Sequence, residues 1–563
     1  MNHLLKPADY IVFLIYFFVV AGYGWWIYRR KKSGAAGTKD YFLAEGSLTW
    51  WAIGASLIAS NISAEQFIGM SGEGFFSGIA VAVYEWIGAV TLVIIAIWFM
   101  PIYLKNRIYT MPQFLKERYN ETVAVIMAVF WLFLYVFVNL TSILYLGSKA
   151  ISTLAGSEYF HVILLLLSLF ALLITLGGMK VIGYTDVIQV AVLIIGGGVA
   201  VWLALEKVDE VVNHGRSAWS GFHTLMNQAP DHFHMIFEKP NASSSADYVA
   251  KYVALPGITM YFAGQWIANL NYWGCNQYIT QRALGADLQT ARNGILFASF
   301  IKIFMPVIVM LPGIAAFILY KNGYFSAGTF GGNKDGAYGA ILSLLPVGMK
   351  GLSVAALTAA IVASLAGKAN SISTIFTLDI YHRYIDSKAD EKKLVWIGRL
   401  TILVAILIAI GCCWEDLLGI GREGGFTFIQ KYTGFISPGV FALFMLGMFW
   451  KRTTSAAAIA GLIGGLLLVI LFNNYAPALF GNDTWLYTAY PTGNGKFEIP
   501  FMVNMGWSFF FTVALMVLIS LTGPKINPKA FQTDKAQYAV RPSTIAIATM
   551  ILLLILALYV KFW

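Results

Sequence analysis

Long apolar runs of roughly 18–25 residues follow one another along the chain, with short polar segments between them. A helix of about 20 apolar residues crosses the ~30 Å hydrocarbon layer of a bilayer, and a helix satisfies its own backbone hydrogen bonds there. Charged residues make up only 12% of the chain, against about a quarter in a soluble protein. The pattern therefore predicts an all-α membrane protein.

We expect about fourteen transmembrane helices in a single transmembrane domain over residues 1–563. The expected spans are 10–28, 48–71, 79–103, 123–154, 160–177, 181–205, 255–278, 294–319, 350–381, 394–413, 426–449, 455–473, 501–521 and 543–560. An even number of spans puts both termini on one side of the membrane. With both termini outside, 23 Lys and Arg lie in inward segments and 12 in outward ones, which fits the retention of positive loops in the cytoplasm. We expect a multi-pass protein of the cell (inner or plasma) membrane with both termini on the outer side.

The net charge of +10 comes largely from basic residues beside the spans, as in Arg29–Lys32, Lys392–Lys393 and Lys451–Arg452. Such clusters are typical of membrane loops that face the cytoplasm. We therefore predict a lipid bilayer as the environment, with no nucleic-acid partner and no protein partner. Two longer polar connections, 206–250 and 473–500, lie outside in this topology, where we expect surface caps or a lid.

The sequence contains no enzyme motif in the structural context that such a motif requires. The segment Gly419–Gly424 has the spacing G-x-G-x-x-G, but a dinucleotide site needs that motif after a strand, within a βαβ unit. Here it joins two expected helices. The sequence also has no P-loop and no nucleophile elbow. We expect no enzymatic activity.

Polar residues interrupt the second span most strongly. Asn61, Glu65 and Gln66 lie close together there among many Gly and Ser residues. Such polar side chains are costly in lipid and normally face a protein interior or water. Gly and Ser also let the helix unwind, and unwound backbone carbonyls coordinate sodium in transporters with broken helices. The alternative is small-residue helix packing with incidental polar contacts.

Four other spans carry polar side chains at depths that lipid disfavours. They contain Tyr84-Glu85-Trp86, then Asn269, Tyr272 and Trp273 on one helix face, then Lys302 in an apolar stretch, and finally Phe426 and Gln430 at i and i+4. Together they offer a carboxylate, an ammonium, amides and aromatic rings. These groups suit the hydroxyls and the flat apolar faces of a neutral polyol. We interpret the set as a candidate sugar site.

Five stretches of the chain resemble the sodium:solute symporter family, and most closely its bacterial sodium/galactose and animal sodium/glucose cotransporters. They are Asp40–Ala44, Asn61–Gly72, Tyr184–Gln189, Asn276–Arg282 and Thr377–Tyr381. The resemblance implies a LeuT-like core of two inverted five-helix repeats over residues 48–449, an extra helix at 10–28 and extra C-terminal helices in 455–563. It also implies a secondary active transporter that imports a monosaccharide, glucose or galactose, with sodium by alternating access.

Carried over residue by residue, the resemblance implies a sugar site made of Gln66, Glu85, Asn269, Lys302 and Gln430. It implies an outer gate made of Met70, Tyr84 and Phe426. It also implies an inner gate made of Tyr272, which stacks on the sugar ring. In the galactose transporters a serine follows the glutamate by three positions, whereas here that position is Gly88. One hydrogen bond to the sugar is then lost or replaced by water, which leaves both glucose and galactose open.

The resemblance also implies a site for a co-transported sodium ion. Its ligands would be the backbone carbonyls of Ala59, Ile62 and Ala360 and the hydroxyl of Ser364. The family has two adjacent serines at this place, and here the first is Ala363. One oxygen ligand is therefore missing.

Lys368 stands where the family usually has an apolar residue, one helical turn after Ser364 on the same face. Its ammonium would partly substitute for sodium or make the coupling proton-linked. Asp186, which the resemblance places near the inner exit path, is a candidate partner. The alternative is that Lys368 extends to the cytoplasmic interface, as lysines near the ends of spans often do.

Two rival functions remain open. The first is a transporter of the same fold for another solute, such as inositol or a carboxylate, although the charge of Glu85 would repel a carboxylate. The second is a membrane sensor or an uncoupled channel that binds sugar without concentrating it.

Overall fold

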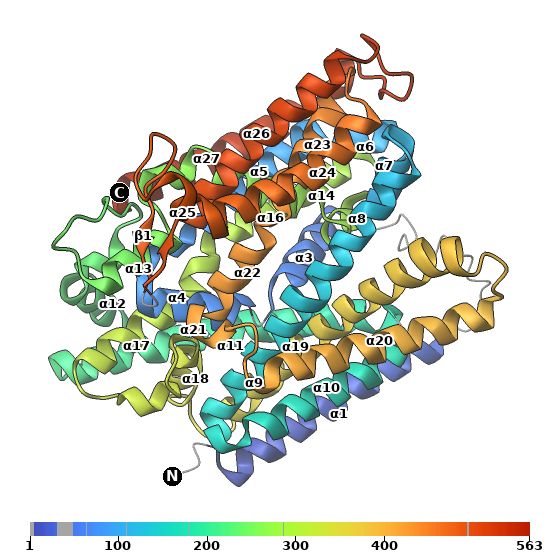
Figure 1. The fold of residues 1–563 in the computed structure, drawn as a ribbon. Helices are drawn as coiled ribbons and strands as arrows, with labels where there is room; N and C mark the ends of the chain where they lie inside the picture. Colours follow the sequence, from blue (N-terminus) through green and yellow to red (C-terminus); the bar gives the residue numbers. More distant parts are fainter. Residues whose placement is uncertain are drawn as a thin grey trace.

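The computed structural model describes residues 5–30, 49–63, 65–108, 110–177, 179–284, 286–492 and 495–563. The stretch Asp40–Ala44, which contributed to the family resemblance, lies outside the described residues. The described chain is a bundle of long helices with a few short connecting elements (Figure 1).

A helix lies in every expected span. The principal helices are α1 Pro7–Arg30, α3 Trp50–Asn61, α4 Met70–Ser77, α5 Val83–Ile94, α6 Met100–Lys105, α8 Glu121–Phe133, α9 Thr141–Ala155, α10 Phe160–Gly177, α11 Met179–Asn213, α14 Gly264–Cys275, α16 Leu288–Val309, α17 Leu311–Lys321, α19 Met349–Thr374, α20 Glu391–Trp414, α22 Gly425–Thr433, α23 Ser437–Phe449, α24 Ser455–Ile470, α26 Phe501–Leu521 and α27 Pro542–Phe562. Within the described residues, nine helices are long and apolar enough to cross a membrane, or ten if α22 and α23 form one span with a 49° bend. The number is below fourteen partly because α3 and α14, with 12 residues each, are pieces of broken spans.

Shorter elements connect these helices. They are α7 Met111–Arg118, α12 Ala218–Gln228, α13 Ala246–Ala254, α15 Gln277–Leu284, α18 Ala337–Leu342, α21 Ile420–Glu423, α25 Ala476–Phe480 and the antiparallel strands β1 Tyr490–Pro491 and β2 Phe497–Glu498. The G-x-G-x-x-G segment forms α21 with its caps and follows helix α20 rather than a strand, so the rejection of a dinucleotide motif is confirmed.

The second expected span is broken where its polar residues lie. Helix α3 ends at Asn61, and Ile62 has an extended ψ of 109°. A π-helical turn over Glu65–Gly69 then leads into α4. The last four carbonyls of a helix have no intrahelical partner, so the end of α3 presents free oxygens at this break, as the sequence predicted.

Glycines bring the broken span against its neighbours. A Cβ at Gly54 of α3 would come within 2.7 Å of the Gly294 carbonyl oxygen of α16, and a Cβ at Gly313 of α17 would come within 1.8 Å of the Ser71 carbonyl oxygen of α4. Small residues allow such close backbone approach between membrane helices. The two halves of the broken span are therefore seated against α16 and α17, which positions the polar residues at the break beside α16.

The N-terminal end of α1 and the C-terminal end of α27 lie at the same end of the bundle as the long connections (Figure 1). The backbone N–H of Met235, in the first long connection, donates to the Phe562 carbonyl at 2.7 Å. Lys239 donates to the Thr488 hydroxyl at 3.1 Å, which joins the two connections to each other. Elements α12, α13, β1 and β2 thus cover one end of the bundle, as expected of surface caps.

Candidate functional site

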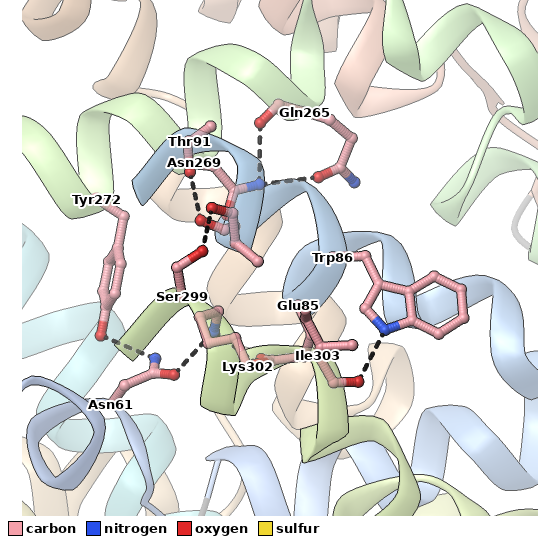
Figure 2. A network of polar contacts seen from close by, with 12 residues as sticks. Asn61, Glu85, Trp86, Thr91, Gln265, Asn269, Tyr272, Ser299, Lys302 and Ile303 are labelled. Atoms are coloured by element: carbon pink, nitrogen blue, oxygen red, sulfur yellow. Dashed lines mark hydrogen bonds and ion pairs between the residues drawn. The ribbon is translucent and has the colours of Figure 1, made fainter. Parts of the chain in front are cut away.

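A fully buried lysine is the centre of the site (Figure 2). Lys302 of α16 has an exposed fraction of 1%. Its Nζ atom lies 2.6 Å from Glu85 Oε2 and donates to Asn61 Oδ1 at 3.1 Å. The ammonium also lies 4.7 Å from the ring centroid of Trp273, within cation–π range. Helices α3, α5, α14 and α16 thus each give one group to a single charged cluster.

Two hydrogen bonds hold α5 against α16 (Figure 2). One is accepted by the backbone of α5, and the other is donated by a side chain of α5. Ser299 Oγ donates to the Ala89 carbonyl at 2.7 Å, and Trp86 Nε1 donates to the Ile303 carbonyl at 3.2 Å. In an apolar bundle, helices associate through close packing and such polar contacts. These two bonds lie on either side of Lys302 along α16 and fix Glu85 in register with it.

Helix α14 presents amide and phenol groups to the same cluster. Asn269 is buried, and its Nδ2 donates to the Gln265 carbonyl at 3.0 Å and to Gln265 Oε1 at 3.2 Å. Tyr272 is half-buried, and its hydroxyl accepts a hydrogen bond from Asn61 Nδ2 at 3.3 Å. The predicted shared face of Asn269, Tyr272 and Trp273 therefore lines the cluster.

Two of the expected outer-gate residues, Tyr84 and Phe426, are in contact. The rings of Tyr84 and Phe426 meet edge to face, with centroids 5.0 Å apart. A Cβ at Gly69 would lie 2.8 Å from Phe426 Cβ and 3.2 Å from its backbone N, so the π-helical turn packs closely against the backbone of Phe426. Met70 next to it is fully buried. Tyr272, the expected inner gate, contacts Asn61 and the ring of Trp273, 5.2 Å away between centroids.

Two expected sugar-binding residues lie at the edge of the cluster. Gln66 is buried in the π-helical turn, and its Oε1 has no hydrogen-bond partner in the described part of the chain. Gln430 is half-buried on α22, one turn after Phe426. The described residues show no hydrogen bond from either side chain to Lys302 or Glu85.

Sequence reasoning did not assign two residues of this site. Asn61 bridges Lys302 and Tyr272, and its polarity in an apolar span had marked it without giving it a role. Gln265 is fully buried one turn before Asn269, and the i, i+4 spacing on an expected span was the signal that could have found it.

Next to the gate residue Phe426, five residues form a polar cluster, here called the latch: Glu73, Lys334, Asp335, Gly425 and Thr427. Lys334 Nζ lies 2.7 Å from Glu73 Oε1, which also accepts from the Thr427 hydroxyl at 2.5 Å. Asp335 Oδ2 accepts from the Gly425 N–H at 2.9 Å. Burial raises the pKa of Asp335 to about 7, against the opposing effects of Lys334 and the Gly425 N–H. The latch joins α4 and α22 through the connection between α17 and α18.

The expected sodium ligands lie on the two elements that the resemblance implied. Ala59 is in the last turn of α3 and Ile62 just past its end, where carbonyls are free of intrahelical bonds. Ala360 is buried on α19, and Ser364 is half-buried one turn later. No group of three or more His, Cys, Asp or Glu side chains that could hold a metal ion occurs in the described residues.

Lys368 does not extend to the membrane interface, so that interpretation is wrong. It is buried, and its Nζ donates to Asn139 Oδ1 at 2.9 Å and lies 5.1 Å from the ring centroid of Tyr135. It also interacts electrostatically with Glu65, just after the break in the second span. Packing of α19 against neighbouring helices encloses the side chain before it can reach water. Asp186 lies on α11, but its side chain is outside the described part of the structure.

Comparisons with known sequences bear on this arrangement. A family profile described as "SSF: Sodium:solute symporter family" matches residues 41–465. A sodium/glucose cotransporter of Vibrio parahaemolyticus is 41% identical, over 100% of this chain and 99% of that protein. Sodium/myo-inositol cotransporter 2 of Mus musculus is 33% identical, over 82% of this chain and 69% of that protein.

Solved structures agree on the fold. A Na+-coupled sialic acid symporter, solved in a substrate-bound outward-open state, matches with a TM-score of 0.71 at 21% identity, over 93% of this chain and 99% of that one. The nucleobase-cation-symport-1 family transporter MHP1 matches with a TM-score of 0.52 at 12% identity, over 88% of this chain and 98% of that one. The expected LeuT fold is confirmed, while the boundaries 48–449 and 455–563 stay predictions. With a profile match over most of its length and a full-length relative at 41% identity, the chain belongs to the sodium:solute symporter family.

Proposed function

We propose that this protein is a secondary active transporter that imports a monosaccharide, glucose or galactose, together with sodium by alternating access. Transport requires no covalent chemistry, and we assign no enzymatic activity. The observation that carries the proposal is the buried cluster of Lys302, Glu85 and Asn61 beside the break in the second span. Buried ionisable groups in a membrane bundle typically mark a substrate or ion pathway.

The charges of the cluster favour a neutral substrate. Lys302 and Glu85 neutralise each other at 2.6 Å, so the pair has no net charge to offer an anion or a cation. The pair still has a donor and an acceptor that hydroxyl groups can engage, and Asn269 adds amide groups. Trp273 and the half-buried Tyr272 supply aromatic surface for the apolar face of a sugar ring. The relatives include cotransporters named for glucose and for myo-inositol, both of which are neutral polyols.

The proposal is tested by uptake into proteoliposomes that contain the purified protein. Radiolabelled glucose, galactose, myo-inositol and a sugar carboxylate are offered separately, with and without an inward sodium gradient. We expect glucose or galactose to accumulate above the external concentration only with the gradient. Accumulation of inositol or of the carboxylate alone would reassign the substrate, and binding without accumulation would favour a sensor or a channel.

The buried Lys368 supports a second candidate, in which coupling to sodium is weak. Ala363 removes a hydroxyl from the implied sodium site, and Lys368 places a fixed ammonium one turn beyond Ser364, near Glu65. A tethered cation of this kind would partly replace the ion in balancing the carboxylate of Glu65.

Separate sodium and proton gradients distinguish the two candidates. If Lys368 replaces sodium in part, the wild type keeps substantial sugar uptake without sodium, and the variant Lys368→Met becomes more dependent on it. The double variant Ala363→Ser/Lys368→Met restores the implied ligand set and is expected to bind sodium most tightly. Strict sodium dependence of the wild type, unchanged by Lys368→Met, would exclude this candidate.

A further inference from the structure

Gly88 leaves no room for a side chain that reaches the cluster from this position of α5. A Cβ at Gly88 would lie 2.8 Å from Lys302 Cε and 3.0 Å from Asn269 Oδ1. A larger side chain at this position would therefore press on both groups in the observed arrangement. The backbone carbonyl of Gly88 is also engaged, because it accepts from the Thr91 hydroxyl at 2.8 Å. A hydrogen-bond donor to the substrate at this corner has to come from another helix.

Gln265 lies on that other helix, next to Asn269 (Figure 2). It is fully buried on α14, and its Oε1 accepts from Asn269 Nδ2 at 3.2 Å. Because Asn269 Nδ2 also donates to the Gln265 carbonyl at 3.0 Å, both contacts of that amide nitrogen are made to Gln265. Asn269 Oδ1, which lies 3.0 Å from the Cβ position of Gly88, is left facing the cluster. Gln265 thus orients Asn269 as an acceptor.

The amide nitrogen of Gln265 has no well-formed hydrogen bond. Gln265 Nε2 is buried and meets no acceptor with good hydrogen-bond geometry within the described residues. The carboxamide is within hydrogen-bonding reach of the phenol of Tyr84, one of the gate residues, which is its nearest polar neighbour there. Buried polar groups are nearly always hydrogen-bonded, so a poorly satisfied donor beside a gate residue can be satisfied by a ligand.

We propose that Gln265 binds the sugar directly, with its Nε2 donating to one hydroxyl. The proposal rests on the sugar-transport function proposed above. It assigns Asn269 Oδ1 as the acceptor and Gln265 Nε2 as the donor at the same corner of the sugar. A pair of this kind recognises one hydroxyl, or two adjacent ones, by their geometry.

A panel of singly deoxygenated glucose and galactose analogues tests this assignment. Each analogue competes with the radiolabelled parent sugar for uptake by the wild type and by Gln265→Met, which has similar length but neither donor nor acceptor. In the wild type, loss of the recognised hydroxyl weakens competition by about tenfold. For Gln265→Met, the analogue without the recognised hydroxyl should compete as well as the parent sugar, with a ratio of about one. The penalties for loss of each other hydroxyl should stay as in the wild type. The matched control is Gln289→Met. Gln289 is a half-buried glutamine of α16 whose amide bonds to Asn293 and Thr544.

A purely structural role of Gln265 predicts a different result. If it only holds Asn269, the variant weakens binding of every analogue by one common factor, and the profile of penalties keeps its shape. That outcome, or an unaltered profile, overturns the proposal. Gln265→Asn keeps a buried amide but shortens the side chain by one methylene. The profile of penalties measured with this variant is therefore a second test of Gln265. A wild type that takes up no sugar overturns the proposed function itself, which separates the two failures.

Discussion

At the scale of single residues, the pair of Glu85 and Lys302 decides what the site can hold. Both side chains are almost completely buried, so each charge depends on the other and on Asn61 for stabilisation. Removing one member of such a pair leaves an uncompensated buried charge, whereas removing both charges is often tolerated. The pair is therefore expected to be linked both to stability and to sugar binding.

The first prediction separates these two roles. Glu85→Gln or Lys302→Met alone should lower the thermal stability of the detergent-solubilised protein, with a cost of about 3–5 kcal/mol for a fully buried pair. The double variant Glu85→Gln/Lys302→Met should recover most of that stability and remain unable to transport sugar. Thermal melting and vesicle uptake of all three variants measure this. Equal stability of the single and double variants would contradict the role of the pair.

At the scale of elements, the latch connects the two helices that carry the gate. Asp335 faces Lys334 on its own turn, Glu73 from α4, Lys149 from α9 and the N–H of Gly425 from α22. Its pKa of about 7, against an ordinary value of 3.8, means that the enclosed carboxyl binds a proton more tightly than a hydrated one. Protonation therefore stabilises the arrangement in which Asp335 is enclosed as in this structure, here called the closed latch. The gain is complete below the ordinary pKa and is lost as pH rises through about 7.

The second prediction follows from this pH dependence, in which lower pH favours the closed latch. Between pH 8 and pH 6, with equal pH on both sides of the vesicle, the equilibrium should shift roughly tenfold toward the closed latch. The initial rate of sugar uptake should fall accordingly if opening of the latch limits it. Asp335→Asn keeps an oxygen for the Gly425 N–H but does not titrate in this range, so its rate should be nearly independent of pH. The same pH profile in this variant and in the wild type would rule out Asp335 as the titrating group.

At the scale of the whole molecule, the start of α1, the end of α27 and both long connections occupy one end of the bundle (Figure 1). The carbonyl of Trp563 contacts His234 Nδ1 at 2.9 Å, and Asp9 Oδ1 accepts from the Gly348 N–H at 2.7 Å. The terminal helices are thereby tied to connections that precede or follow other spans. The protein is a multi-pass membrane protein, and we propose that this end faces outward in the cell membrane, as the distribution of Lys and Arg favours.

The third prediction concerns this orientation. A reporter enzyme that is active only outside the cytoplasm, fused after Trp563, should be active, and the same reporter inserted in the connection at Lys388 between α19 and α20 should be inactive. A fluorescent protein that folds only in the cytoplasm should give the opposite pattern. The reversed result for both reporters would place the termini inside.

Much of this protein could be predicted from local sequence. Apolar runs of sufficient length have to form helices in lipid, and the Gly, Ser and polar residues around Asn61 have to break one of them. The site residues that carry charge, Glu85 and Lys302, were found because lipid excludes unpaired charge. Gln265 was not found, although it stands four residues before Asn269, because the spacing alone does not show that the two side chains are bonded to each other.

The sequence by itself determined the membrane class, the helices, the break in the second span and the family. Each of these depends on periodicity, apolar length or motifs that are local in the chain. Tertiary packing alone decided that Lys302 pairs with Glu85, 217 positions away, and that Lys368 bonds to Asn139 instead of extending to water. The same packing left Gln265 Nε2 beside Tyr84 without a hydrogen bond of good geometry. Partners that are distant in sequence are fixed only by helix contacts, such as the close approach at Gly54 and Gly294, which no local pattern specifies.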